Sequence, residues 1–132
     1  MLVRTVLFAG LLTLLIVADA SARPTSRRRP RPPIRGATLR LTATAYCEHG
    51  TTTSGTPTRE GIVAADPRRL PLGTRLQILA PGKPYARTYT VTDTGSGIKG
   101  RDLDIFMSSC ERAKKFGRRV VVARILRQRE QR

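Results

Sequence analysis

The sequence predicts a small all-β domain, a closed barrel of about six strands that carries one short helix. Three observations lead to this prediction. Short segments rich in strand-forming residues recur along the chain, turns containing glycine or proline separate them, and a single segment has both a start and a stop signal for a helix. At 132 residues, the chain has room for one domain.

The strand pattern appears in segments 39–46, 61–65, 74–79, 86–92, 103–107 and 119–126. Segments 39–46 and 86–92 alternate between apolar and polar residues, as half-buried strands do, whereas 61–65 is a short apolar run. The helix is expected over residues 109–116, because Ser108 or Ser109 is a suitable N-cap and Gly117 a suitable stop.

The first 22 residues have the layout of a secretory signal peptide. Arg4 precedes an almost wholly apolar run over residues 6–18, and small residues follow at 20–22. We expect residues 1–22 to be removed by Sec-type export, which places the protein in the periplasm, at the outer membrane or in the extracellular wall. The alternative is an uncleaved membrane anchor, but that requires about 20 apolar residues, more than this run contains.

The chain is strongly basic, with 25 Lys and Arg against 9 Asp and Glu, a formal charge of +16. Arginine and proline dominate residues 23–35, which we interpret as a disordered linker, and residues 127–132 form a basic tail around a folded domain of residues 36–126. Such charge implies a polyanionic neighbour. Nucleic acid is not expected, because the chain lacks tryptophan and has few aromatic residues for base stacking. We expect a monomer whose arginine-rich arm adheres to the anionic cell envelope.

The chain contains two cysteines, Cys47 and Cys110. In an oxidising compartment two cysteines in a small domain usually join, so we predict a disulfide. A metal pair or a catalytic thiol is the alternative. With His49 as the only histidine and no CxxC spacing, the ligands for zinc are too few, and neither a metal nor an organic cofactor is expected.

Three aspartates stand in distinctive positions. Asp66 ends an apolar run, Asp93 ends a strand before a glycine-rich loop, and Asp104 lies between two apolar strand residues. A carboxyl group held near apolar surface tends to have a raised pKa, which is what a general acid requires. From the pattern alone, the alternative remains open that Asp66 and Asp93 cap turns and that Asp104 faces solvent.

Ordered motifs extend this interpretation: residues 44–47 (TAYC), 53–57 (TSGTP), 61–67 (GIVAADP), 70–74 (LPLGT), 93–100 (DTGSGIKG) and 103–106 (LDIF). Together they resemble the 3D (three-aspartate) domain family over nearly the whole of residues 36–126. This resemblance implies a six-stranded double-psi β-barrel, like the catalytic barrel of membrane-bound lytic transglycosylase A.

The resemblance also implies roles for the aspartates. The three that name the family correspond to Asp66, Asp93 and Asp104, and in the lytic transglycosylase A branch the strand aspartate after the glycine-rich loop is the catalytic acid, here Asp104. Asp93 would shape the charge around Asp104, and Asp66 would lie across the cleft. The predicted substrate-binding residues are Thr53, Ser54, Gly95 and Lys99.

The implied activity is lytic transglycosylation, the cleavage of the MurNAc–GlcNAc β-1,4 bond in peptidoglycan glycan strands. The full transglycosylase has a second domain that this chain has no room for, which favours an alternative: a non-catalytic peptidoglycan-binding or wall-loosening module with an expansin-like barrel. A third interpretation is a surface-adhering protein whose barrel supports the arginine-rich arm.

Overall fold

The computed structural model describes residue 31 and residues 33–127. The predicted signal peptide, most of the predicted linker and the tail beyond Arg127 lie outside the described residues. Residues 31 and 33–37, which belong to the linker and the start of the predicted domain, contain no helix or strand. No helix in the described part of the chain is long and apolar enough to span a membrane.

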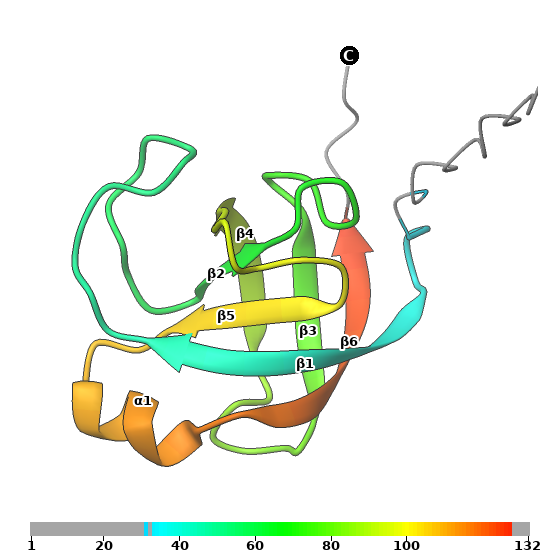
Figure 1. The fold of residues 1–132 in the computed structure, drawn as a ribbon. Helices are drawn as coiled ribbons and strands as arrows, with labels where there is room; N and C mark the ends of the chain where they lie inside the picture. Colours follow the sequence, from blue (N-terminus) through cyan, green and yellow to red (C-terminus); the bar gives the residue numbers. More distant parts are fainter. Residues whose placement is uncertain (1–30, 32, 128–132) are drawn as a thin grey trace, which may run out of the picture.

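The described residues form six strands and one helix (Figure 1). Their bounds are β1 Thr38–Tyr46, β2 Ile62–Ala65, β3 Arg75–Ala80, β4 Thr88–Asp93, β5 Asp102–Phe106, α1 Cys110–Phe116 and β6 Arg119–Arg127. Every predicted element is present. The predicted start of the fourth strand at residue 86 is wrong by two residues, because the backbone N–H groups of Ala86 and Arg87 donate to Gly82 and Tyr85 within the preceding turn.

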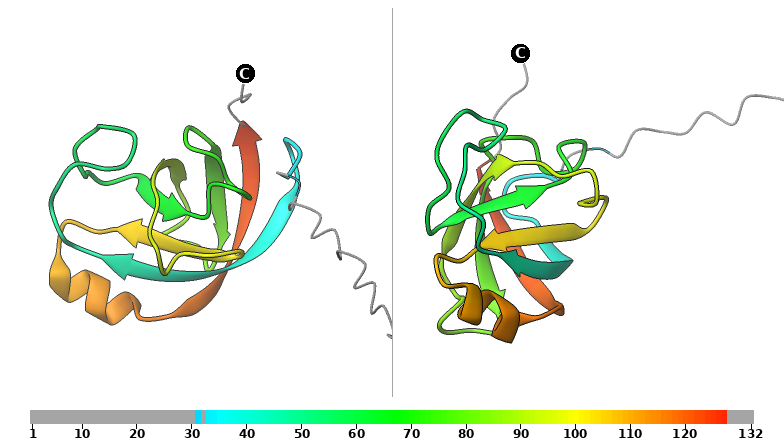
Figure 2. Two further views of the ribbon diagram at one scale, coloured as in Figure 1. Left: turned by 45° about the horizontal axis from the view of Figure 1, so that its top comes forward. Right: turned by 60° about the vertical axis from the view of Figure 1, so that its left-hand side comes forward.

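The strands close into a barrel in the order β1-β5-β2-β4-β3-β6. Two pairs are parallel, β1 with β5 and β2 with β4, and the other four pairs are antiparallel. Figure 2 shows how β1 and β6 curve around the barrel while α1 covers one end. The predicted all-β barrel with one short helix is therefore confirmed.

The barrel interior is filled by alternate strand residues. Along β5, Leu103 and Ile105 are fully buried and point inward, whereas Asp104 between them is only partly buried and lies on the outer surface. Leu76 and Ile78 of β3 fill the interior in the same way. Full burial of such a side chain contributes about 1.5–3 kcal/mol each, so this alternation fixes which residues face outward.

The helix is held at both ends by local contacts. The side chain of Ser109 accepts a hydrogen bond from the backbone N–H of Arg112, and Gly117 ends the helix with a φ of 63°, a conformation that favours glycine. Arg119 donates from its guanidinium to the carbonyl of Phe116 and lies over the Phe116 ring, 4.3 Å from its centroid. These contacts satisfy carbonyl groups that the helix leaves free.

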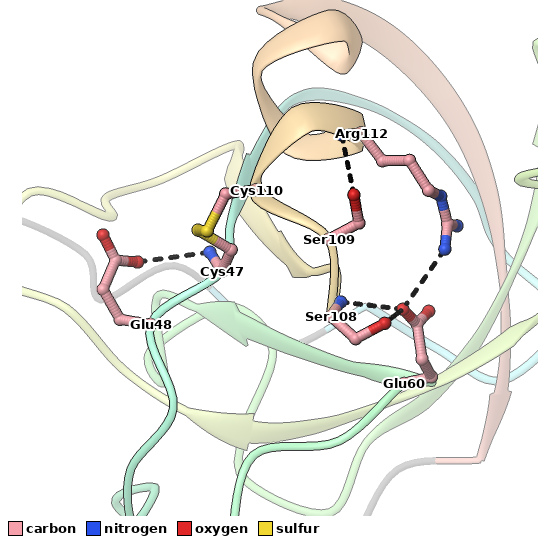
Figure 3. The surroundings of a disulfide bond; sticks show 7 residues. All are labelled: Cys47, Glu48, Glu60, Ser108, Ser109, Cys110 and Arg112. Carbon is pink, nitrogen blue, oxygen red and sulfur yellow. Dashed lines mark hydrogen bonds and ion pairs between the residues drawn. A yellow bond between two sulfur atoms is a disulfide. The ribbon is translucent and has the colours of Figure 1, made fainter.

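A disulfide joins Cys47, just after β1, to Cys110, the first residue of α1 (Figure 3). The two Cα atoms are 5.0 Å apart, and both cysteines of the chain are used. Close by, Glu60 accepts hydrogen bonds of 2.8 Å from the backbone N–H and the hydroxyl of Ser108. The loop of residues 47–61 is thus attached at both ends to the segment that begins the helix.

Replacement of both cysteines by serine should destabilise the barrel. The disulfide closes a loop of 63 residues, and loops of this size are expected to contribute about 4 kcal/mol, although engineered cases often give less. We expect urea unfolding to show a free energy lower by about 2–4 kcal/mol. Reductant should lower the stability of the wild type and leave the double variant unchanged; equal stability of the oxidised and reduced wild type would contradict this.

Candidate active site

Two of the three aspartates lie in one row across the outer surface of the barrel. In register, Asp104 of β5 pairs with Thr44 of β1 on one side and with Ala64 of β2 on the other, and Ala64 in turn pairs with Asp93 of β4. The register of β2 and β4 shifts between Val63 and Ala64, and this irregularity brings Asp93 opposite Ala64. The charges of both Asp93 and Asp104 act on Tyr46, which agrees with their position on one face. The small side chain of Ala64 lies between the two aspartates, so no bulky group separates them.

Asp104 is partly buried and holds one direct partner. The hydroxyl of Thr44 donates a hydrogen bond of 2.9 Å to Oδ1 of Asp104. Burial raises the pKa of the Asp104 carboxyl, the negative charge of Glu48 raises it further, and the hydrogen bond from Thr44 acts in the opposite direction. A carboxyl group with a raised pKa on an outer face is suited to donating a proton.

Tyr46 lies two residues beyond Thr44 on β1, on the same side of the strand. Burial and the charges of Asp93 and Asp104 raise the pKa of Tyr46 to about 12, so the phenol is neutral and remains a donor at ordinary pH. Its hydroxyl is buried and has no hydrogen-bond partner within residues 31 and 33–127. The ring packs edge-to-face on Phe106, 5.4 Å between centroids. Buried polar groups are nearly always hydrogen-bonded, so an unpartnered donor close to two carboxylates marks a candidate position for a ligand.

Asp93 anchors the loop of residues 47–61 over the end of β4. Its Oδ1 accepts hydrogen bonds from the backbone N–H of Thr53 at 3.0 Å, from the Thr53 hydroxyl at 2.8 Å and from the backbone N–H of Thr94 at 2.9 Å. Because the Thr53 hydroxyl has a single proton, the 2.9 Å contact with the Thr94 hydroxyl must be donated by Thr94. The backbone N–H of Ser54 donates to the carbonyl of Thr92.

The two predicted substrate-binding residues of this loop therefore lie beside Asp93. Thr53 and Ser54 are both exposed, and the side chains of Thr52, Ser54 and Thr56 form a hydroxyl cluster with contacts of 3.0 to 3.2 Å. The cluster presents donors and acceptors on the part of the loop that hydrogen-bonds to the end of β4.

Asp66 is placed differently from the other two aspartates. It is 2% exposed, and its carboxylate accepts hydrogen bonds from Nε, Nη2 and the backbone N–H of Arg68 and from the backbone N–H of Gly100 at 2.8 Å. The side-chain hydrogen bonds from Arg68 are the main reason why the pKa of Asp66 lies far below its ordinary value. Its carboxylate connects the turn after β2 to the glycine-rich loop.

The glycine-rich loop of residues 95–100 already uses some of its backbone donors. The N–H of Ile98 donates to Gly95, and that of Gly100 donates to Asp66. At Gly95 a Cβ atom would come within 2.9 Å of Cγ1 of Ile98, so glycine is needed there for packing within the loop. Lys99 is exposed and leaves its ammonium group accessible.

Two residues of this surface, Thr44 and Tyr46, were not among the predicted site residues. Both belong to the alternating pattern of the first strand, which predicts that their side chains project to the same face of the sheet. What the pattern could not show was which distant strand lies beside them. Within the described part of the chain, no group of three or more His, Cys, Asp or Glu side chains is arranged to hold a metal ion.

The fold and this surface define a class: a small closed β-barrel of mixed strand direction with carboxylates on its outer surface. Residues 61–127 match the 3D domain family, and the chain belongs to that family. Two of the three aspartates of the family pattern thus lie in one outer row, and the third, Asp66, is buried and paired with the exposed Arg68.

A relative from Bacillus subtilis (strain 168) is the cell wall-binding protein YocH, which is 31% identical over 97 residues. The match covers 67% of this chain and 32% of YocH. Among solved structures, MltA from E. coli with bound chitohexaose aligns with a TM-score of 0.52 at 21% identity, covering 61% of this chain and 28% of MltA.

A second crystal structure of MltA from Escherichia coli, described as a unique lytic transglycosylase fold, gives a TM-score of 0.50 at 23% identity. At these identities the similarity to MltA concerns the fold. The chain spans about a third of YocH and less than a third of MltA.

The neighbours of Asp104 should move its pKa in opposite directions. Thr44→Val removes the hydrogen bond that favours the ionised carboxylate, so the pKa of Asp104 should rise; Glu48→Gln removes a negative charge, so it should fall. NMR titration of the Asp104 side-chain carboxyl carbon measures both changes. Shifts of the same sign in the two variants would contradict this account of the site.

Asp66→Asn should reduce stability in a pH-dependent way. Because its folded-state pKa lies below the unfolded value of about 3.9, the ionised carboxylate stabilises the fold above that pH, and the stabilisation is lost as the pH falls through the folded-state pKa. We expect a loss of about 2–3 kcal/mol at neutral pH. Urea unfolding at a series of pH values should show the difference from wild type narrowing in acid.

The control for this experiment is Asp102→Asn. Asp102 forms a 3.5 Å ion pair with Arg118, which is 67% exposed, and such surface pairs contribute about 0–1 kcal/mol. The account is contradicted if Asp102→Asn lowers the free energy of unfolding as much as Asp66→Asn does. It is also contradicted if the effect of Asp66→Asn does not depend on pH, since the buried carboxylate would then not act as an ionised anchor.

Proposed function

We propose that this protein acts on peptidoglycan and cleaves the MurNAc–GlcNAc β-1,4 bond by lytic transglycosylation, with Asp104 as the catalytic acid. The observation that carries the proposal is the environment of Asp104: a partly buried carboxyl group with a raised pKa, on the outer surface of the barrel, beside the unpartnered hydroxyl of Tyr46. A general acid needs a pKa raised toward the working pH.

The reaction requires one carboxyl group in two roles. Asp104 gives its proton to the glycosidic oxygen as the bond from that oxygen to C1 of MurNAc breaks. The C6 hydroxyl of the same sugar then attacks C1, and its proton passes to the Asp104 carboxylate, which restores the acid and leaves a 1,6-anhydro end. No water is consumed, and no metal or organic cofactor takes part.

The arrangement of Asp93 supports a mechanism with a single carboxyl group. Three donors from Thr53 and Thr94 occupy the Oδ1 atom of Asp93, so this carboxylate is engaged in holding the loop. Ordinary glycosidases use two carboxyl groups flanking the bond. We therefore assign to Asp93 the placement of the loop that carries Thr53, and to Asp66 the support of the glycine-rich loop.

Substrate contacts are proposed on both sides of Asp104. The hydroxyl groups of Thr53 and Ser54 and the ammonium group of Lys99 are exposed and suit the hydroxyl and carboxylate groups of a glycan strand with its peptides. Gly95 permits the compact loop that bears Lys99. Tyr46 adds a neutral donor next to the reacting bond.

The relatives support a location in the cell envelope. YocH is named as a cell wall-binding protein, and MltA has been solved with bound chitohexaose, a glycan of the same linkage class. We propose that residues 1–22 are a signal peptide, that residues 36–126 form the working domain, and that the basic segments at 23–35 and 127–132 hold the monomer on anionic envelope surfaces in the periplasm, at the outer membrane or in the wall.

A second candidate function is binding to peptidoglycan without cleavage, as in a wall-loosening module. Two observations favour it. The chain covers only 28% of MltA, and YocH, whose match covers 67% of this chain, is named as a cell wall-binding protein. In this case the outer row of Thr44, Asp104 and Asp93 would contact glycan as hydrogen-bonding groups alone.

Asp104→Asn should abolish release of 1,6-anhydro sugars while leaving wall binding intact. The amide keeps the size of the side chain but has no proton to give, and loss of a general acid typically costs about 10²–10⁴-fold. Purified peptidoglycan is incubated with each protein, and soluble products are identified by mass spectrometry. Because Asp104 serves as acid and base, we expect a loss at the upper end of that range.

Asp102→Asn is the matched control, since it makes the same chemical change two residues away on β5. It should retain nearly full release. Equal release by wild type and Asp104→Asn would remove Asp104 from the mechanism, and absence of release from a folded, wall-bound wild type would establish the binding function in its place.

A further inference from the structure

Charge is fully segregated between the strands of the barrel. The acidic residues within strands are Asp93 of β4 and Asp102 and Asp104 of β5, and β1, β3 and β6 contain none. The basic residues within strands are Arg40 of β1, Arg75 of β3 and Arg119, Arg124 and Arg127 of β6. In the barrel order, β3-β6-β1 and β5-β2-β4 are each contiguous, so the barrel has a cationic half and an anionic half.

Three of these arginines form an exposed group on the cationic half. Arg40, Arg75 and Arg124 are exposed, and each follows or precedes a buried interior residue, so their side chains point outward. We call these three residues the arginine face. Arg119 is not part of it, because its guanidinium is used by Phe116 at the end of the helix.

The strand register arranges the arginine face across three strands. Arg124 on the central strand β6 pairs with Thr38 of β1 on one side and Gln77 of β3 on the other. Arg40 lies two residues after Thr38 and pairs with Val122. Arg75 lies two residues before Gln77 and pairs with Arg127, so the two arginines lie toward opposite ends of β6. Diagonal neighbours in a regular sheet are about 7–8 Å apart, which applies to Arg40 and Arg124. The register shifts between Arg75 and Leu76, so Arg75 lies further along β6, opposite Arg127, and the three residues follow a line rather than enclose a point.

The surroundings of the arginine face add positive charge, and the one carboxylate near it, Asp102 on the neighbouring strand β5, forms an ion pair with Arg118. Gly36 and Ala37 hydrogen-bond to Ile125, which places exposed Arg35 beside the end of β6. The four ion pairs among residues 31 and 33–127 all lie elsewhere, at Arg68, Arg87, Arg112 and Arg118. In that part of the chain no ion pair involves Arg40, Arg75 or Arg124.

We propose that the arginine face binds a linear phosphodiester polyanion of the cell envelope. Guanidinium groups match phosphate oxygens with paired hydrogen bonds, and a line of cations matches repeating charges along a polymer better than it matches one small anion. Asp104 lies on β5, beside β1, whereas the arginine face runs from Arg40 of β1 across β6 to β3, so a polymer bound along it leads away from Asp104. The proposal does not depend on the cleavage reaction.

A linear polymer fits this face better than a membrane surface does. Proteins that lie at a membrane interface commonly insert tryptophan or tyrosine, and the only aromatic residue of β1, β3 and β6 is Tyr46, which packs on Phe106 at the boundary with β5. Two large apolar side chains near this face are exposed and suit lipid, Val120 of β6 at 52% and Ile34, next to Arg35, at 80%. Lipid is therefore the competing occupant in the test.

The test compares two charge-matched triple variants of the mature protein. Arg40→Gln, Arg75→Gln and Arg124→Gln together remove the arginine face, whereas Lys83→Gln, Lys114→Gln and Lys115→Gln remove as many exposed charges near the helix. The probe is fluorescein-labelled poly(glycerol phosphate), and anisotropy is measured over a range of NaCl concentrations. Circular dichroism checks the fold, and the single variant Arg124→Gln replaces the triple variant if the latter does not fold.

Loss of the arginine face should weaken polymer binding by about tenfold or more. It should also reduce the slope of log affinity against log salt by about 2–3. The lysine variant should stay close to wild type in both. Equal losses in both variants would show that net charge alone acts and would overturn the proposal. Absence of wild-type binding would also overturn it. Binding that depends on the arginine face but occurs with phosphatidylglycerol vesicles rather than the polymer would identify lipid as the occupant instead.

Discussion

The parallel pairing of β1 with β5 is the constraint on which the rest of this molecule depends. Parallel strands cannot be joined by a tight turn, so the chain between them must travel around the barrel and contribute β2, β3 and β4 on the way. Because this pair closes in one register, Thr44 meets Asp104 across 60 residues of sequence. A shift by one residue would turn Asp104 into the interior and Leu103 out to solvent.

Three aspartates from one family pattern acquire three different properties from their surroundings. Asp66 is buried but fully paired, which lowers its pKa and keeps it ionised. Asp104 is partly buried, which raises its pKa, and the hydrogen bond from its one hydroxyl partner only partly offsets this. Asp93 binds the backbone and hydroxyl of Thr53 and fixes a loop. Desolvation and hydrogen bonding decide these outcomes, since the side chain is the same each time.

The loop of residues 47–61 is held by both a disulfide and hydrogen bonds. The disulfide of Cys47 fixes its first residue, and Asp93 holds its tip. Glu60 fixes its far end by accepting hydrogen bonds from Ser108. Burial raises the pKa of Glu60, but these hydrogen bonds and two arginine charges lower it overall. A loop attached at three points presents its hydroxyl groups in one arrangement, which would reduce the entropy lost on binding the proposed glycan.

The sequence by itself determined the barrel class, the six strands, the helix with its caps at Ser109 and Gly117, and the pairing of the two cysteines, because strand periodicity, capping chemistry and cysteine count are local or compositional properties. Only the tertiary structure decided that Thr44 supports Asp104, that Gly100 closes the Asp66 pair, and that arginines and aspartates occupy opposite halves of the barrel. Those facts depend on which distant strands become neighbours and in which register, and no local pattern encodes that.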